Sequence, residues 1–160
     1  NLNSLFYLAK AVVPSMMKRK TGSIIALGGQ ASVTSQPQRA HVIASKHGLF
    51  GLIKALALEL GPYNVRANLI ALMTIENVRA NPEWYGGHSG YSEEDLAAIP
   101  MKRAGKPQEV ANVAVFLASE QSSYVTGDRI LCGNSGAQIT VDGEEDLIMR
   151  EEDVLGIVEA

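Results

Sequence analysis

Two residues near the start of one predicted helix have side chains that could do chemistry. Lys46 lies about one turn into an apolar segment, residues 41–60, where a charged amine is costly to bury unless something binds it. His41 begins the same segment, and an imidazole has an ordinary pKa of roughly 6.5, which suits proton transfer. Lys46 could equally be a lysine whose aliphatic stem packs on the helix while its amine reaches water. The residues alone leave both interpretations open.

The elements that would position these side chains alternate along the chain. Helical spacing of apolar residues covers 1–18, 41–60 and 106–119, and short apolar runs predict strands over 23–27, 65–72 and 124–131. A short helix is predicted from residue 92, and residues 73–92 read as a long loop of the kind that covers a site. This order predicts an α/β fold, with a partial Rossmann-like parallel sheet and flanking helices.

The composition favours a packed protein without nucleic-acid or membrane partners. The 160 residues are 46% apolar and 19% charged, with a net charge of −3 and one cysteine, Cys132. That balance gives no electrostatic support for nucleic-acid binding, and one cysteine excludes an internal disulfide or a cysteine-based zinc site. We expect a cytoplasmic protein with no metal site. Because the chain opens on Asn1 inside a predicted helix, we also expect its natural start to lie upstream.

The charge is unevenly spread along the sequence. Residues 1–140 contain 13 basic and 9 acidic side chains, a net charge of +4, whereas residues 141–160 contain 8 acidic side chains against Arg150. A shift of that size at one end indicates a tail or a segment of different origin.

An ordered set of short motifs resembles the C-terminal half of the short-chain dehydrogenase/reductase family over residues 1–127. Those motifs are Asn1–Phe6, Gly22–Ile25, Ala44–Leu49, Leu58–Gly61, Asn64–Asn68, Pro107–Ala111, Phe116–Ser119 and Tyr124–Gly127. The resemblance implies hydride transfer between NAD or NADP and a carbonyl or alcohol substrate. It also implies a homo-oligomer that pairs through helices 1–18 and 41–60.

Four positions carry the chemistry that this resemblance implies. In the family, a tyrosine four residues before the lysine is the general acid/base, and the lysine holds the nicotinamide ribose and lowers the tyrosine pKa. A serine thirteen residues before the tyrosine binds the substrate oxygen, and an asparagine orders a water. The asparagine and lysine positions are Asn1 and Lys46, but the serine and tyrosine positions are Gly29 and Val42. His41 is the nearest substitute, about 100° around the helix from Val42.

The resemblance also places cofactor contacts at Lys46, Ile75 and Asn77. The Pro-Gly pair that normally follows the next strand is Leu72-Met73 here. A dinucleotide site needs a glycine-rich turn between a strand and a helix, and the sequence has none in that context. We therefore expect little NAD(P) binding by this chain alone.

The last part of the chain resembles the end of a GroES-type co-chaperonin, on Asp142–Glu145, Leu147–Glu151 and Asp153–Glu159. The resemblance implies a β-rich tail over 128–160 and a junction near 126–128. The apolar runs at 147–149 and 154–158 themselves predict two short strands around an acidic turn. The loop with which that family grips its chaperonin has no counterpart, so no chaperone function carries over. Natural fusion, engineered recombination and a mis-assembled gene all fit.

Two functional hypotheses follow from the sequence. The first is an NAD(P)-dependent oxidoreductase that is inactive as given, because Val42 and Gly29 lack the necessary hydroxyl groups and the nucleotide-binding half is absent. The second is a non-catalytic remnant, fusion or self-associating scaffold.

Overall fold

The computed structural model describes residues 1–32, 34–35, 37–76, 92–133, 137–141 and 144–148. The helices and strands of this part are α1 (Leu2–Arg19), β1 (Gly22–Leu27), α2 (Ala40–Leu60), β2 (Val65–Leu72), α3 (Glu93–Ala97), α4 (Pro107–Ala118), β3 (Arg129–Cys132), β4 (Ala137–Val141) and β5 (Glu144–Ile148). Helices and strands alternate from α1 to β2, and two α-helices and then three strands follow.

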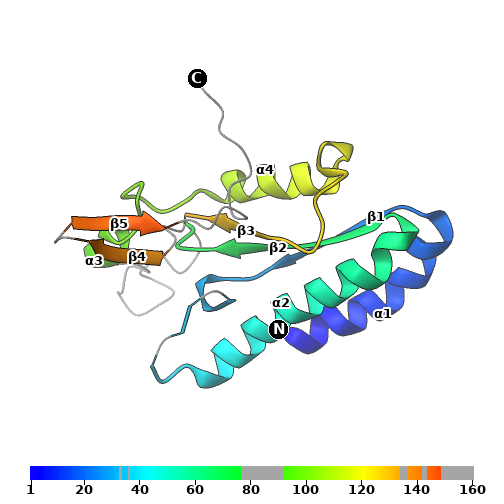
Figure 1. Cartoon of the computed structure of the whole chain (residues 1–160), viewed down its shortest axis with the longest axis horizontal. Helices are drawn as coiled ribbons and strands as arrows, with labels where there is room; N and C mark the ends of the chain where they lie inside the picture. Colours follow the sequence, from blue (N-terminus) through cyan, green and yellow to red (C-terminus); the bar gives the residue numbers. More distant parts are fainter. Residues whose placement is uncertain (33, 36, 77–91, 134–136, 142–143, 149–160) are drawn as a thin grey trace, which may run out of the picture.

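Three of the strands form a parallel sheet in the order β1-β2-β3. Gly22 to Leu27 pair with Val65 to Ile70, and Leu69 to Leu72 pair with Arg129 to Cys132. Helices α1 and α2 lie on one face of this sheet and α4 lies on the other (Figure 1). The predicted α/β fold with a parallel sheet is confirmed.

The core lies between α2 and the facing side of β2. Alternate residues of β2 point toward the helix, since side chains along a strand alternate between its two faces. Val65, Ala67, Leu69 and Ala71 supply the strand side, and Leu49, Ile53, Ala57 and Leu60 supply the helix side. This packing fixes α2 on the sheet, and with it Val42 and Lys46.

The third strand begins later than the sequence predicted. Its predicted range was 124–131, but β3 starts at Arg129 because residues 125–128 are held by other bonds. The buried side chain of Asn68 donates to the carbonyl of Val125 at 2.8 Å and accepts from the backbone N–H of Asp128 at 3.2 Å. Gly127 has a left-handed backbone, with φ +77°, which no regular strand adopts.

The tail contains a β-hairpin placed differently from the sequence prediction. Strands β4 and β5 pair antiparallel, from Ala137 opposite Ile148 to Val141 opposite Glu144. The strand predicted over 147–149 overlaps the end of β5, which begins earlier, at Glu144. The strand predicted over 154–158 lies outside the described residues.

Candidate functional site

Three segments meet at the carboxyl edge of the parallel sheet. The ammonium group of Lys46 donates to the carbonyl of Leu27, the last residue of β1, with 3.5 Å between Nζ and O. The amide of Asn1, at the start of α1, donates from Nδ2 to the Ser45 hydroxyl on α2 at 3.5 Å. In open α/β sheets, ligands bind outside the carboxyl ends of the strands. Asn1 and Lys46 therefore lie where a ligand site is expected.

The Lys46 side chain has hydrogen-bonding capacity left over. It is half-buried, and an ammonium group has three N–H donors. Within the described part of the chain its one hydrogen bond is the long one to Leu27. Its other donors are therefore available to a hydroxyl-bearing ligand at this edge.

Val42 lies one helical turn before Lys46 and supplies no proton-transfer group. Its side chain is half-buried, and its carbonyl accepts the Ser45 hydroxyl at 2.9 Å. Ser45 thus links Val42 to Asn1, a connection that sequence reasoning missed although the serine stands next to the lysine. His41 is exposed at the start of α2, and one position on a helix turns its side chain by about 100° from that of Val42.

Two adjacent glycines, Gly28 and Gly29, follow β1 and have different surroundings. A Cβ on Gly28 would lie 2.8 Å from the Leu69 side chain and 3.0 Å from the Ser32 hydroxyl. A Cβ on Gly29 would meet nothing closer than the carbonyl of Leu72 at 3.9 Å. The hydroxyl and backbone N–H of buried Ser32 both donate to the Gly29 carbonyl, at 2.6 and 2.8 Å. Position 29 therefore has room for a serine, whereas the hydroxyl of Ser32 already has an internal partner.

The other predicted cofactor positions lie around the ends of β2 and β3. Ile75 forms an isolated parallel bridge with Gly105 and lines a mainly apolar cavity of about 200 Å³. Cys132 lines the same cavity, and burial raises the pKa of its thiol. Met73 donates its backbone N–H to the Cys132 carbonyl at 3.0 Å. Asn77 lies outside the described residues.

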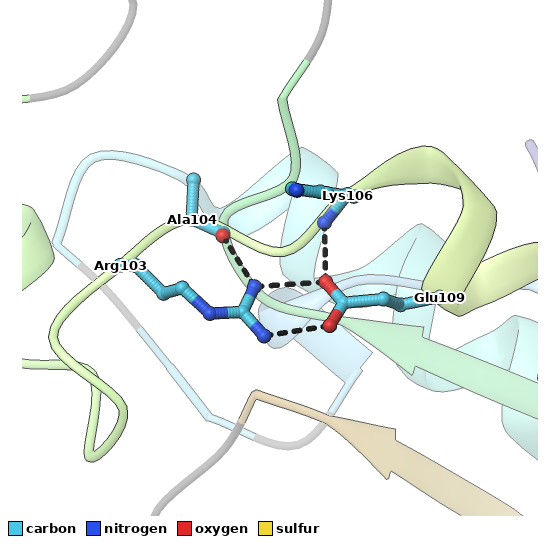
Figure 2. A network of polar contacts seen from close by, with 4 residues as sticks. All are labelled: Arg103, Ala104, Lys106 and Glu109. Atoms are coloured by element: carbon cyan, nitrogen blue, oxygen red, sulfur yellow. Dashed lines mark hydrogen bonds and ion pairs between the residues drawn. The ribbon is translucent and has the colours of Figure 1, made fainter.

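An ion pair fixes the chain beside this cavity, at the start of α4 (Figure 2). The two terminal nitrogens of Arg103 donate to the two carboxylate oxygens of Glu109, at 2.8 and 2.6 Å. The backbone N–H of Lys106 donates to the same carboxylate at 2.6 Å. The hydrogen bond from Arg103 and, after it, the one from Lys106 lower the pKa of Glu109 from 4.5 to about 2. The same hydrogen bond to Glu109 raises the pKa of Arg103.

No helix in the described ranges has the length and apolar character needed to cross a membrane. In the same residues, no group of three or more His, Cys, Asp and Glu side chains is arranged to hold a metal ion.

The parallel sheet with helices on both faces places the chain among the open α/β proteins, and the chain matches one family of that class. Residues 1–136 match the family model described as enoyl-(acyl carrier protein) reductase. The chain therefore belongs to the short-chain dehydrogenase/reductase family, as its motifs predicted.

Curated relatives of the chain are reductases. The 3-oxoacyl-(acyl-carrier-protein) reductase FabG of Thermotoga maritima is 39% identical over 132 residues, which cover 81% of this chain and 51% of that protein. The bovine dehydrogenase/reductase SDR family member 4 is 38% identical over 131 residues, covering 82% of this chain and 46% of that protein. The chain spans about half the length of the curated relatives it matches.

Solved structures with the same fold include proteins with bound nicotinamide cofactors. A 3-oxoacyl-(acyl-carrier protein) reductase with bound NAD from Brucella melitensis is 36% identical, with a TM-score of 0.69 over 82% of this chain and 47% of its own. A gluconate 5-dehydrogenase from Burkholderia cenocepacia, in complex with NADP and tartrate, is 27% identical, with a TM-score of 0.75 over 82% and 51%.

Proposed function

We propose that this chain is half of an NAD(P)-dependent oxidoreductase for a carbonyl or alcohol substrate, and that it has lost the proton-transfer step. The observation that carries the proposal is the position of Lys46 at the carboxyl edge, one turn after Val42. Family membership supports the reaction class. The identities of residues 29 and 42 support the loss.

The fit of a nicotinamide cofactor is partial. The unused donors of Lys46 suit the hydroxyl groups of a ribose, and Asn1 reaches α2 through Ser45. When bound, NAD(P) supplies or accepts the hydride. The glycine-rich turn that binds a pyrophosphate is missing from this sequence, so tight binding requires a contribution from other polypeptide.

The proposed defect follows from the chemistry of two side chains. Reduction of a carbonyl needs a proton for the developing alkoxide, and valine has none to give. Glycine at position 29 supplies no hydroxyl for the substrate oxygen. General acid–base groups typically contribute about 10²–10⁴ in rate, so the loss of this group alone would make turnover hard to detect.

The test combines binding and turnover on the purified chain. NADH and NADPH binding is followed by fluorescence, and turnover is measured on a panel of ketones and alcohols. We expect weak binding that Lys46→Ala reduces and Lys54→Ala does not, because Lys54 lies on the same helix two turns away. Turnover by the unmodified chain would contradict the proposed loss. Absence of nucleotide binding, also when the half of a relative that this chain does not span is supplied, would contradict the cofactor assignment.

A second candidate is a non-catalytic, self-associating scaffold. The observation that favours it is a group of exposed apolar side chains on α1, which are Phe6, Tyr7, Leu8 and Val12, together with Leu58 on α2. Exposed apolar patches mark interaction surfaces, and the family resemblance implies pairing through the same two helices. Turnover that depends on Lys46 would contradict the scaffold, whereas oligomer formation without nucleotide binding would favour it.

The match to the family model extends through residue 136 and includes β3, so we also propose a separate origin only for the chain after residue 136, as the co-chaperonin resemblance of residues 142–159 implies. The net charge of residues 141–160 supports this, since it is opposite in sign to that of the preceding chain. Cleaving the chain by limited proteolysis tests the idea, because an independently acquired tail should be removable without loss of the remaining fold. Unfolding of residues 1–136 after removal of the tail would contradict it.

A further inference from the structure

Two cationic side chains lie against one aromatic ring between α2 and β3. The guanidinium carbon of Arg129, the first residue of β3, is 5.0 Å from the centroid of the Phe50 ring on α2. The ammonium nitrogen of Lys54, one turn further along α2, is 5.7 Å from the same centroid. A cation within about 6 Å of an aromatic ring centroid is attracted to the ring. We call Phe50, Lys54 and Arg129 the cationic cluster.

The two charges of the cluster have no acidic partner in the described part of the chain. The ion pair that the described residues form joins Arg103 to Glu109, at the start of α4. The acidic residue next to the cluster in sequence is Asp128, and its carboxylate accepts the backbone N–H of Arg129 at 2.7 Å. Among the described residues, the cluster is therefore a pair of positive charges without a neutralising group.

The Arg129 guanidinium also has hydrogen-bonding capacity left over. Its Nε is buried and has no hydrogen-bond partner among the described residues, although a guanidinium carries five N–H donors. An unsatisfied buried donor destabilises the fold, and a carboxylate can accept two guanidinium N–H groups side by side. Arg129 is half-buried and Lys54 is exposed, so a carboxylate can approach both from solvent. The chemistry of the cluster suits an acidic peptide.

The last part of the sequence has the opposite charge. Residues 149–160 lie outside the described residues, and they contain four acidic side chains against Arg150. Three of the acidic residues, Glu151, Glu152 and Asp153, are consecutive. Side chains two positions apart lie on the same side of an extended chain. Glu151 and Asp153 can therefore face two neighbouring cations at once.

The path of the chain brings this segment back toward the cluster. Strands β4 and β5 are antiparallel and place Ile148 opposite Ala137. Eight residue steps lead from Ala137 back to Arg129, a path of at most about 28 Å. The acidic residues of the segment lie three to eleven steps after Ile148, and an extended chain covers about 10 to 38 Å over those steps. The segment is thus long enough to reach the cluster of its own chain.

We propose that the acidic segment 149–160 binds the cationic cluster of its own chain through its carboxylates. The unneutralised charges, the unsatisfied Nε of Arg129 and the length of the segment support this occupant. Exposed ion pairs stabilise weakly one by one, so the contact opens and closes and weakens with salt. The cluster is separate from Lys46, which lies two turns before Lys54 on α2, and the binding does not require catalysis.

Cross-linking of the full chain tests the contact. A carbodiimide joins an amine to a carboxylate only where the two touch, and mass spectrometry identifies the joined peptides. At low salt we expect Lys54 to be linked to residues 149–160 about three to ten times as often as Lys10, an exposed lysine of α1. At about 1 M salt, where charges are screened beyond about 3 Å, the two lysines should react alike.

Cleavage by trypsin after Arg150 gives a second, independent measurement. Proteolysis follows the population of the open form when opening is fast. The Lys54→Gln, Arg129→Gln double variant should be cleaved there about three to ten times faster than the unmodified chain. Lys54→Gln alone, at an exposed position, should show part of this effect, and Lys10→Gln none. Circular dichroism checks that the variants fold, and Lys54→Gln keeps the test decisive if the double variant does not.

Three results would overturn the proposal. The first is cross-linking of Lys54 to the segment at no more than the Lys10 level in low salt. The second is a Lys54 cross-link found only in dimers, which would make the segment of a second copy the occupant. The third is cleavage after Arg150 at an unchanged rate in Lys54→Gln. None of them depends on nucleotide binding or turnover, so the proposed function is judged separately.

Discussion

Val42 and Lys46 lie one turn apart on α2, and between them the Val42 carbonyl accepts the hydroxyl of Ser45, which also holds Asn1. Helix geometry brings residues four apart onto the same face. The lysine therefore has a valine beside it where the family has its proton donor. Under the proposed function, Lys46 is the retained binding group and Val42 stands at the position of the lost proton donor.

The first prediction concerns cofactor binding. Lys46→Ala should weaken NADH or NADPH binding by about 1.5–3 kcal/mol, the usual contribution of a hydrogen bond to a charged group. Fluorescence titration measures the change. Lys54→Ala is the control, because Lys54 contacts the Phe50 ring instead. Equal effects of the two substitutions would show that Lys46 acts through general charge.

The second prediction compares the two glycines after β1. Gly28→Ala should destabilise the fold by about 1–3 kcal/mol, because its Cβ would overlap the Leu69 side chain. Gly29→Ala should change the free energy of unfolding by less than about 0.5 kcal/mol, since its nearest neighbour would be 3.9 Å away. Urea denaturation measures both. A destabilised Gly29→Ala variant would contradict the described turn and the room for a serine there.

Much of the fold could be predicted from local sequence, as β2 illustrates. Its predicted range, Val65–Leu72, is the observed one, because an apolar run follows Asn64, whose left-handed backbone ends the preceding turn. The start of β3 was predicted wrongly. Val125 belongs to an apolar stretch, but Asn68, 57 residues away, holds its carbonyl outside the strand. A buried polar anchor distant in sequence leaves no periodic signal.

The candidate site was predictable only in part for the same reason. The spacing of Val42 and Lys46 is local to one helix. The contact of Asn1 with Ser45 joins residues 44 positions apart, and that of Lys46 with Leu27 joins residues 19 positions apart. Both depend on how different elements pack together. Sequence reasoning reached these residues through motif order and not through contacts.

A third prediction concerns the pH dependence of stability. The Glu109 pKa is lowered from 4.5 to about 2, mainly by Arg103, so the ionised carboxylate stabilises the fold above pH 4.5. That contribution is lost as the pH falls from 4.5 toward 2, because in this range the unfolded chain binds a proton at Glu109 more readily than the folded chain does. The difference in melting temperature between the unmodified chain and Glu109→Gln should shrink over this range. Glu59→Gln, an exposed change on α2, is the control, and a pH-independent difference for Glu109→Gln would contradict the assignment.

A fourth prediction concerns self-association through α1. Leu8→Glu places a charge among the exposed apolar residues of that helix and should shift sedimentation toward the monomer if the helix mediates pairing. Val115→Glu is the control, because Val115 is 68% exposed on α4, on the other face of the sheet. Loss of association with Val115→Glu alone would assign the interface to α4.

The most direct test of the account restores the two missing hydroxyl groups. Turnover of ketones with NADH and NADPH would be measured after co-expression with the half of a relative that this chain does not span, comparing the unmodified chain with the Gly29→Ser, Val42→Tyr double variant. We predict no detectable turnover by the unmodified chain and a gain of about 10²–10⁴ in the double variant, which a further Lys46→Ala change reduces. Equal turnover by the unmodified chain and the double variant would contradict the claim that proton transfer was lost at Val42.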